Sequence, residues 1–277
     1  MTRVPLLDFY RHGCVSQDKE QEIRDTLEEC YRRLSVQPLP EKVEVRLCQT
    51  PSQLADFLQA EKGELGIQTV GDESFICSHD AWRGFPRVLV CVARLFALCA
   101  IARLGTLRHE AAHTVLHGGL AYYVFRIPRD CLELAKAKDM DSIMLQQVLY
   151  YCATAVKDFE VTRLLLSLGY RECQAAFGAA QFSASHEDKL AWLLARHHPQ
   201  GKLLFFTSQL KTLLMGWPLE LAGLMPLEDA ADSMLNYLEP EERKRLLGMA
   251  VSIAKQLGDD THNNVRLTLG QVLQELI

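Results

Sequence analysis

Three residues within one five-residue stretch, His109, Glu110 and His113, form the pattern HExxH. Two histidines four positions apart share one face of a helix, so both imidazoles can bind the same metal ion. Glu110 lies beside them, where its carboxylate can take a proton from a metal-bound water instead of binding the metal. Zinc lowers the pKa of such a water toward about 7, and a carboxylate can then remove the proton and later return it. The stretch therefore predicts a zinc site with Glu110 as general base.

The residues around this pattern are typical of a buried helix. Thr106 is expected to cap its N-terminus, and Gly118 and Gly119 are expected to end it. Four apolar positions suit burial against a core: Ala111, Ala112, Val115 and Leu116. The alternative is a surface helix with an accidental histidine pair, which these apolar positions disfavour.

A third zinc ligand is expected on the helix predicted across residues 151–166, because two histidines need one more protein ligand and an open position for water. Glu160 falls on a polar stripe with Lys157 and Arg163, which is expected to face solvent. Asp158 falls on a mostly apolar face, where a carboxylate is costly unless it is paired or metal-bound. We therefore predict Asp158 as the third ligand, with Glu160 as the alternative.

Other polar residues are expected to support the site. Thr162 follows Asp158 by about one turn and could hold a metal-binding imidazole in place. His117 lies two turns beyond His109 and drifts about 80° around the helix, so we expect it to support a ligand or the helix terminus. The competing explanation for Asp158 is a buried ion pair with an arginine such as Arg108.

Hydrolysis also needs a donor that stabilises the developing oxyanion. The sequence offers five candidates and does not choose among them: Tyr122, Tyr123, His186, His197 and His198. His197 and His198 also suit a helix C-terminus, where a positive charge complements the helix dipole.

Composition narrows the class of protein. The chain has 277 residues, enough for one large domain or two packed ones, and a formal net charge of −5. This charge, without a strong basic run, argues against a general nucleic-acid binder. The nine cysteines are odd in number and form no CxxC pair, which favours free thiols in a reducing cytoplasm.

No segment is expected to enter a membrane. The N-terminus lacks the long apolar region of a signal peptide. The most apolar stretch, residues 88–102, would span roughly 22 Å as a helix, whereas a bilayer core needs about 30 Å. We expect a buried helix there and a cytoplasmic protein.

The elements that position these residues are predicted from periodicity. A charged amphipathic helix is predicted over 18–35, a strand over 43–47 and a helix from Pro51 to about Gly63. Short strands are predicted at 66–70 and 74–77. From Arg87 onward the pattern is almost wholly helical, with Pro218, Pro226 and Pro240 between helices, over the segments 128–138, 141–168, 185–198, 201–215, 226–238, 240–256 and 260–276.

These elements predict an α+β fold that is mostly helical. A small N-terminal sheet and the metal-binding helices are expected in a domain of residues 1–175. An all-helical C-terminal domain, residues 176–277, is expected to pack against it.

HEAAH on one helix with an acidic residue on a later helix resembles the gluzincin-like HExxH zinc metallopeptidases. The run HEAAHTVLHG is similar to ImmA/IrrE-type peptidases and to compact minimal gluzincins. DFEVT, residues 158–162, is similar to the second-helix pattern of gluzincins, with Asp158 where the family has its ligand glutamate and Thr162 where it has Asp or Asn. The resemblance covers about residues 40–170. The metzincin pattern HExxHxxGxxH is not met, because Leu116 stands in place of its glycine.

The resemblance implies zincin-like active-site helices and a substrate that adds as a strand beside the sheet edge. The edge candidate is FICSHDAW, residues 75–82, which would bring His79 and Asp80 to the cleft. The alternative for these two residues is a turn closed by an Asx-type hydrogen bond.

We expect a cytoplasmic zinc metallopeptidase that acts on a peptide or protein substrate, with neither nucleic acid nor membrane as partner. Glu110 would activate water for attack on the peptide carbonyl and pass the proton to the leaving amine. The alternative is a non-catalytic zinc-binding regulatory or interaction protein with a zincin-like fold. A metal-free helical scaffold is the third hypothesis, and the sequence leaves the substrate and oligomeric state open.

Overall fold

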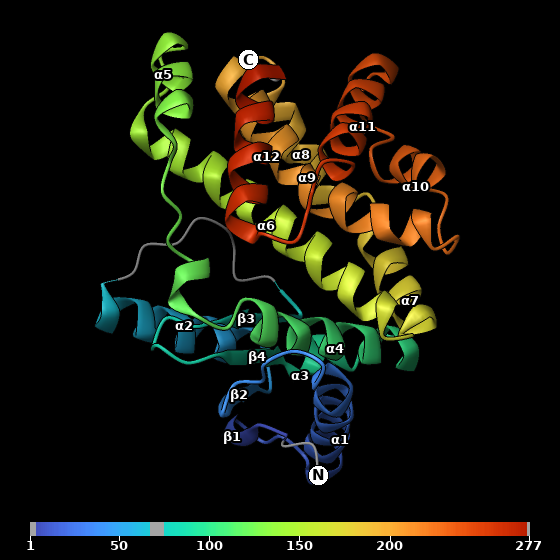
Figure 1. Cartoon of the computed structure of the whole chain (residues 1–277). Coiled ribbons are helices and arrows are strands. Elements are labelled where there is room, and N and C mark those ends of the chain that lie inside the picture. The colour runs from blue at the N-terminus through green and yellow to red at the C-terminus, as the bar shows by residue number, and fades with distance from the viewer. Residues whose placement is uncertain (1–3, 67–74, 276–277) are drawn as a thin grey trace. The chain divides into compact units, whose positions relative to one another are not determined.

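The computed structural model describes residues 4–66 and 75–275 and consists of helices with one small sheet near the N-terminus. The predicted α+β, mostly helical fold class is confirmed (Figure 1). The chain divides into two compact units, residues 1–123 with 167–177 and residues 124–166 with 178–277. No helix in the described part of the chain is both long and apolar enough to cross a bilayer.

The first unit contains a four-stranded sheet with the strand order β1-β2-β4-β3. Its strands are β1 (Leu6–His12), β2 (Lys42–Cys48), β3 (Cys77–Asp80) and β4 (Arg87–Cys91). β1, β2 and β4 are parallel, and β3 pairs with β4 in the antiparallel sense. The strand predicted at 43–47 is confirmed as β2, and the predicted edge segment 75–82 contains the edge strand β3. Most of the predicted strand at 66–70 and the first residue of the predicted strand at 74–77 lie outside the described residues, which exclude 67–74. The end of the second prediction, Cys77, is the first residue of β3.

The prediction of one buried helix over residues 88–102 is wrong. These residues form the end of β4, then helix α3 (Val92–Leu95), and then the start of helix α4 (Ala100–Leu116). Every residue of β4 is buried, because the strand lies between β2 and β3. A strand buried on both faces is apolar without alternation, and its sequence cannot be told from a buried helix by periodicity. β1 was not predicted at all.

The helices predicted at 18–35 and after Pro51 are confirmed as α1 (Gln17–Leu34) and α2 (Pro51–Leu65). Thr50 accepts a hydrogen bond from the backbone of Gln53 in a capping box, and Gly66 ends α2 in the left-handed conformation with φ 64°. The predicted stripe of α1 is buried: Ile23, Leu27, Cys30, Tyr31 and Leu34.

The alternation along β3 sends neighbouring side chains to opposite faces of the sheet. Asp80 is in register with Arg87 and accepts hydrogen bonds from it, and Arg87 also donates to Glu61 of α2. Leu54 and Leu58 of α2 also pack in the core on this face of the sheet. His79 therefore points to the opposite face, where its ring meets α4.

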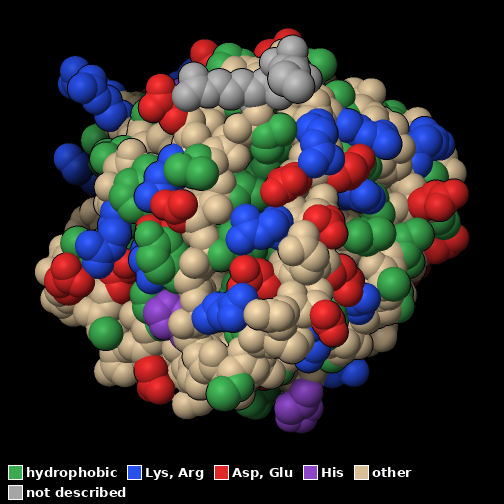
Figure 2. Space-filling view, turned by 90° about the horizontal axis from the view of Figure 1, so that it is seen from below, with side chains coloured by type: hydrophobic (Ala, Val, Ile, Leu, Met, Phe, Trp, Pro, Cys, Tyr) green, Lys and Arg blue, Asp and Glu red, His purple; other side chains and the backbone are tan. Residues whose placement is uncertain are grey.

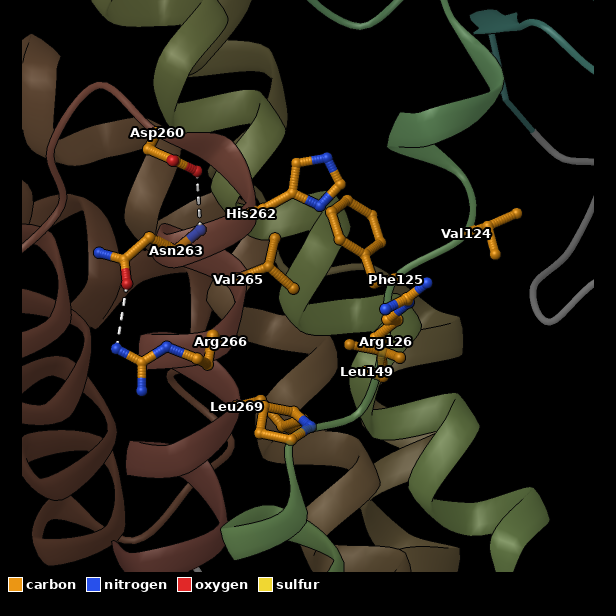
Figure 3. Close-up of a pocket in the computed structure, with 11 residues that line it drawn as sticks. Val124, Phe125, Arg126, Leu149, Asp260, His262, Asn263, Val265, Arg266 and Leu269 are labelled. Atoms are coloured by element: carbon orange, nitrogen blue, oxygen red, sulfur yellow. Dashed lines mark hydrogen bonds between the residues drawn. The ribbon is translucent and has the colours of Figure 1, made fainter.

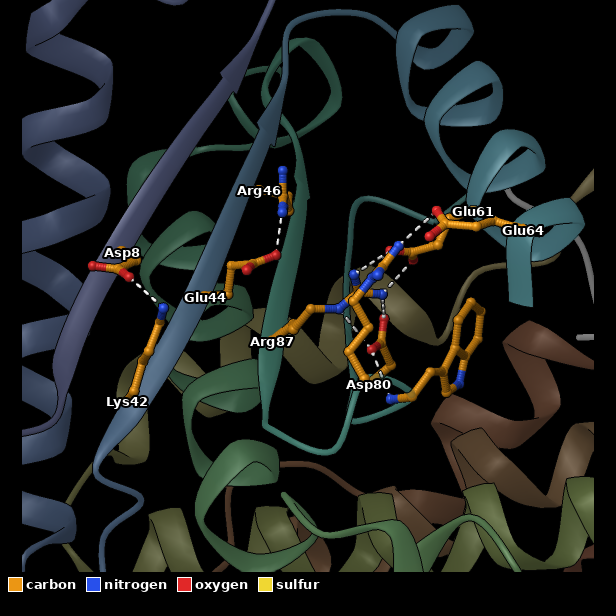
Figure 4. Close-up of polar contacts among 10 residues, drawn as sticks. Asp8, Lys42, Glu44, Arg46, Glu61, Glu64, Asp80 and Arg87 are labelled. Carbon is orange, nitrogen blue, oxygen red and sulfur yellow. Dashed lines mark hydrogen bonds and ion pairs between the residues drawn. The ribbon is translucent and has the colours of Figure 1, made fainter.

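A buried ion network fixes β3 to β4 and α2 (Figure 4). The Arg87 side chain is 0% exposed; it donates to both oxygens of Glu61 at 2.7 and 2.6 Å and to both oxygens of Asp80 at 2.8 Å. Asp80 also accepts from the backbone N–H of Trp82 at 3.3 Å, which is the Asx-type contact that the alternative interpretation expected. Asp80 thus anchors the strand.

The pKa values of the two carboxylates in this network are shifted in opposite directions. Burial raises the pKa of Asp80 above its ordinary value, although Arg87 acts against the rise. Burial also tends to raise the pKa of Glu61, but hydrogen bonds from Arg87 and Arg83 outweigh it and hold this pKa below its ordinary value.

The second unit is all helical, as predicted for the C-terminal segments. Its helices are α5 (Arg129–Ala137), α6 (Ser142–Ser167), α8 (His186–Ala195), α9 (Pro199–Leu221), α10 (Leu227–Met234), α11 (Pro240–Ala254) and α12 (Thr261–Glu275). The last residue of α6 belongs to the first unit, and a second boundary between the units falls within α7 (Arg171–Gln181), after residue 177. Asp141 caps α6 as predicted, accepting from the N–H of Met144 at 2.7 Å. Pro218 was expected between helices, but it lies inside α9, only three residues before its end. There it removes a single helical hydrogen bond.

The polar stripe on α6 does not face solvent, and that prediction is wrong for Lys157 and Glu160, which are both buried. Glu160 accepts from Thr261 and Asn264 of α12, each at 2.7 Å. Such contacts join α6 to the C-terminal helices, so the compact units divide the chain differently from the predicted domains 1–175 and 176–277. The structure groups residues 124–166 with the C-terminal helices.

Charged side chains on the face shown in Figure 2 are interspersed in sign. Along α1, arginines follow glutamates by four residues and pair with them, as in Glu28–Arg32 at 3.1 Å and Glu29–Arg33 at 2.9 Å. Exposed pairs of this kind contribute little to stability, in contrast to the buried Arg87 network.

Replacing the buried guanidinium should destabilise the fold strongly. We expect Arg87→Met to lower the free energy of unfolding by about 3–5 kcal/mol, because Glu61 and Asp80 would remain buried without their cation. The matched control is Arg83→Met, since the part-exposed Arg83 also pairs with Glu61, and it should cost about 1 kcal/mol or less. Urea unfolding measures both, and equal losses would contradict this account.

The acid dependence of stability should reflect Glu61. Its pKa is lowered from 4.5, so its ionised form stabilises the fold above that pH, and this contribution disappears as the pH falls through the lowered pKa. Glu61→Gln should therefore lose less stability than the wild type between pH 6 and pH 3. The pKa of Asp80 is raised from 3.8, so its ionisation contributes to the pH dependence of stability with the opposite sign. Asp80→Asn should therefore not reduce the loss of stability between pH 6 and pH 3. Unfolding midpoints across this range test both variants.

Candidate metal centre

The HExxH residues lie in the last two turns of α4, which begins earlier than predicted. Cys99 is the N-cap residue, and Thr106 lies within the helix, where its hydroxyl donates to the carbonyl of Ala102 at 2.9 Å. Thr106 is therefore not the cap. The predicted end is confirmed at Leu116, and a Cβ on Gly118 would come within 2.1 Å of the Thr114 carbonyl oxygen, so only glycine fits there.

Close packing within the first unit fixes α4. At Gly105 a Cβ would lie 2.2 Å from the carbonyl oxygen of Cys173, and the Gln174 amide donates to the Gly105 carbonyl at 3.1 Å. The fully buried Tyr31 hydroxyl of α1 lies 2.7 Å from the Thr114 hydroxyl. The histidines of α4 thus stand on a helix that is held from two sides.

His109 and His113 bring their ring nitrogens close together. Their Nε2 atoms are 3.1 Å apart, their rings meet at 72°, and both side chains are buried. Two nitrogens at about 2.0–2.1 Å from a tetrahedral zinc would be about 3.3 Å apart. This spacing is compatible with both nitrogens binding one zinc ion, and zinc binding itself stays a prediction.

His117 lies behind this pair. It is the C-cap residue of α4, is fully buried, and its Nδ1 is 3.1 Å from Nδ1 of His113. For His113 to offer a bare Nε2 to a metal, its Nδ1 must carry the proton and donate it to His117. Metal-binding histidines are commonly oriented by such a contact, so the geometry suits the supporting role predicted for His117.

His79 reaches the site from β3. Its Nδ1 is 2.9 Å from an Oε of Glu110, and its ring stacks on His113 with centroids 3.7 Å apart and an interplanar angle of 10°. The donor atoms of His79, Glu110 and His113 all lie within 4.8 Å of one another. However, an imidazole binds a metal in its own ring plane, and one ion cannot lie in the planes of two stacked rings. The stacked arrangement therefore does not suit His79 and His113 as ligands of the same ion.

Two of the oxyanion candidates lie in the same unit as the histidines. The Tyr123 ring is 6.4 Å from His79, and the Tyr122 ring is 5.3 Å from His117. The other three candidates are exposed and belong to the second unit: His186, His197 and His198.

The predicted third ligand and its alternative lie on α6, in the second unit. Asp158 is buried, and its Oδ2 is 3.6 Å from Nζ of Lys211. Both oxygens of Glu160 accept hydrogen bonds from α12, so Glu160 is already used in packing. Thr162 is also buried, and within residues 4–66 and 75–275 its hydroxyl makes no hydrogen bond. Of the two carboxylates, Asp158 remains the better candidate, and its ligation stays a prediction.

Arg108, the arginine named as an example of a partner for Asp158, pairs with Glu29 at 3.1 Å and donates to the Cys173 sulfur at 3.2 Å. The nine cysteines are all free thiols, as predicted. The thiol of Cys77, in β3, is affected by the charge of Glu110. Burial, reinforced by this charge, holds the pKa of the thiol well above its ordinary value. Among the described residues, no cysteine belongs to the groups of donor atoms that lie close enough together to hold a metal ion.

A separate hollow of about 480 Å³ lies in the second unit, between residues 124–128 and α12 (Figure 3). It contains none of the predicted site residues. The carboxylate of Asp260 accepts from the backbone N–H of Asn263 at 2.9 Å and so serves as a helix cap. Arg266 donates to the Asn263 side chain at 3.0 Å. We assign no chemistry to this hollow.

Comparisons of the chain with protein-family models, with curated proteins and with solved structures found no match. The gluzincin resemblance therefore remains an expectation based on the HExxH and DFEVT motifs.

The two carboxylates of α6 should respond differently to neutralisation. We expect Asp158→Asn to weaken zinc binding at least about 10-fold, because a neutral amide oxygen is a weaker ligand than a carboxylate. Glu160→Gln should leave zinc affinity unchanged but lower the free energy of unfolding by about 1–3 kcal/mol, since it disrupts two hydrogen bonds to α12. Chelator competition and urea unfolding measure the two effects. The reverse pattern would make Glu160 the ligand.

Proposed function

We propose that this protein is a zinc-dependent metallopeptidase in which His109 and His113 hold the metal and Glu110 is the general base. The observation that carries the proposal is the 3.1 Å approach of the two Nε2 atoms on a buried helix, with the Glu110 carboxylate beside them. Without a metal, two buried ring nitrogens at this distance must share a proton in a hydrogen bond to avoid a cost in free energy.

Asp158 is the proposed third ligand, on the argument from its place on the apolar face of its helix. Two neutral imidazoles, one carboxylate and an open position for water make up the usual donor set of a catalytic zinc site. A site closed by four protein ligands would serve structure instead.

When bound, zinc supplies a Lewis acid and lowers the pKa of a water molecule toward about 7. Glu110 would take a proton from the attacking water and would give it to the leaving nitrogen of the peptide bond. His117 keeps the proton on Nδ1 of His113, so that Nε2 faces the metal. Tyr123, whose ring lies 6.4 Å from the ring of His79, is the proposed donor to the oxyanion.

A peptide substrate is favoured by the position of β3. This strand is the last in the sheet order, and His79, in the strand itself, contacts the general base. An extended peptide can add to such an edge through main-chain hydrogen bonds. A cytoplasmic location is part of the proposal, since nine free thiols suit a reducing compartment.

Neutralising the general base should separate binding from chemistry. We expect Glu110→Gln to retain bound zinc while peptide cleavage falls by about 10²–10⁴-fold, because Glu110 transfers protons and does not bind the metal. The test is digestion of a peptide library followed by mass spectrometry, with metal content measured on the same samples. The matched control is Glu133→Gln, an exposed glutamate of α5, which should cleave like the wild type.

The proposal fails if wild-type protein with stoichiometric zinc cleaves no peptide in the library. That result would favour the non-catalytic zinc-binding regulator. Loss of zinc from Glu110→Gln would instead show that Glu110 is a ligand.

A further inference from the structure

We propose that His79 is a positioning residue that holds the carboxylate of Glu110 and the ring of His113 in their working orientations. Its catalytic consequence rests on the proposed peptidase function, but the contact itself can be tested without activity. The HExxH motif does not include His79, and the resemblance brings His79 to the cleft without giving it a contact with Glu110 or His113.

Two contacts made by one ring carry the inference. The Nδ1 of His79 is 2.9 Å from Glu110, and the flat face of the ring lies against His113 at 3.7 Å. A carboxylate can only accept, so the Nδ1 of His79 carries the proton of this hydrogen bond. The side chain is 13% exposed, which shields the hydrogen bond from competition with water.

The strand that carries His79 is itself fixed. The next residue, Asp80, receives two hydrogen bonds from the buried Arg87, and Arg87 is held in turn by Glu61 of α2. Because His79 and Asp80 are adjacent and point to opposite faces, the contacts that fix Asp80 on one face also fix the backbone position from which the His79 side chain extends on the other. The ring therefore reaches α4 from a rigid strand, and not from a loop.

Positioning of this kind matters because the tip of a glutamate can rotate. Without His79, Glu110 can turn away from the water it must deprotonate, and a displacement of about 1 Å can cost about 100-fold in rate. His113 would also lose the ring that packs against its face. We therefore expect His79 to act mainly on the rate of the chemical step.

The first experiment observes the proton directly in metal-free protein at pH 8. Long-range 1H–15N correlation spectra distinguish a protonated from a bare ring nitrogen, and His79 is assigned by comparison with His79→Asn. We expect a protonated Nδ1 in the wild type and a protonated Nε2 with bare Nδ1 in Glu110→Ala. A bare Nδ1 in the wild type would overturn the proposal, whether or not the protein cleaves peptides.

The second experiment uses a peptide that the wild type cleaves. His79→Leu should lower kcat by about 10–100-fold while KM and zinc affinity change little. His79→Asn places an amide N–H near the position of Nδ1 and should recover most of kcat. Ser78→Ala, on the same strand but on the opposite face, should match the wild type. Unfolding midpoints of all three variants establish that they fold.

The outcomes separate this inference from the proposed function. Equal loss of kcat in His79→Leu and His79→Asn, with zinc still bound, would exclude the hydrogen bond as the cause. Loss of zinc in both would make His79 a ligand and overturn the positioning role. If the zinc-loaded wild type cleaves nothing, the peptidase proposal fails, and the spectra alone decide whether His79 holds Glu110.

Discussion

The whole arrangement depends on two imidazole nitrogens held 3.1 Å apart in a buried place. Such proximity is unfavourable for two polar rings unless a proton or a cation lies between them. The protein maintains it by immobilising α4, through the close approach of Gly105 to Cys173 and the hydrogen bond between Tyr31 and Thr114. The free energy of packing in the first unit thus keeps the two imidazole nitrogens close together.

β3 joins two kinds of chemistry through adjacent residues. On one face of the sheet, Asp80 takes part in a fully buried ion network with Arg87. On the other face, His79 contacts Glu110 and His113. A strand of only four residues therefore transmits the rigidity of the network to the candidate site. Alternation along a strand commonly sends one side chain to the core and the next to solvent, but here it sends Asp80 to the ion network and His79 to the candidate site.

Local patterns sufficed for part of this fold. HExxH, the turn around Thr50 and the stripe of α1 depend on spacing within one element, and the structure has them as predicted. β4 was missed because a strand covered on both faces loses its period of two. The stripe containing Glu160 was misjudged because a polar face suits a partner helix as well as it suits water. The contact of His79 with α4 joins residues 31 positions apart, and no local spacing reports it.

The glycine at position 105 limits how this protein can vary. A methyl group there would be only 2.2 Å from a backbone oxygen, and backbone yields much less than a flexible side chain. α4 therefore cannot slide or turn on its neighbour without breaking that approach. The reactivity of the histidines can therefore be adjusted through the side chain at position 79 of β3, which contacts Glu110 and His113 without being part of the helix.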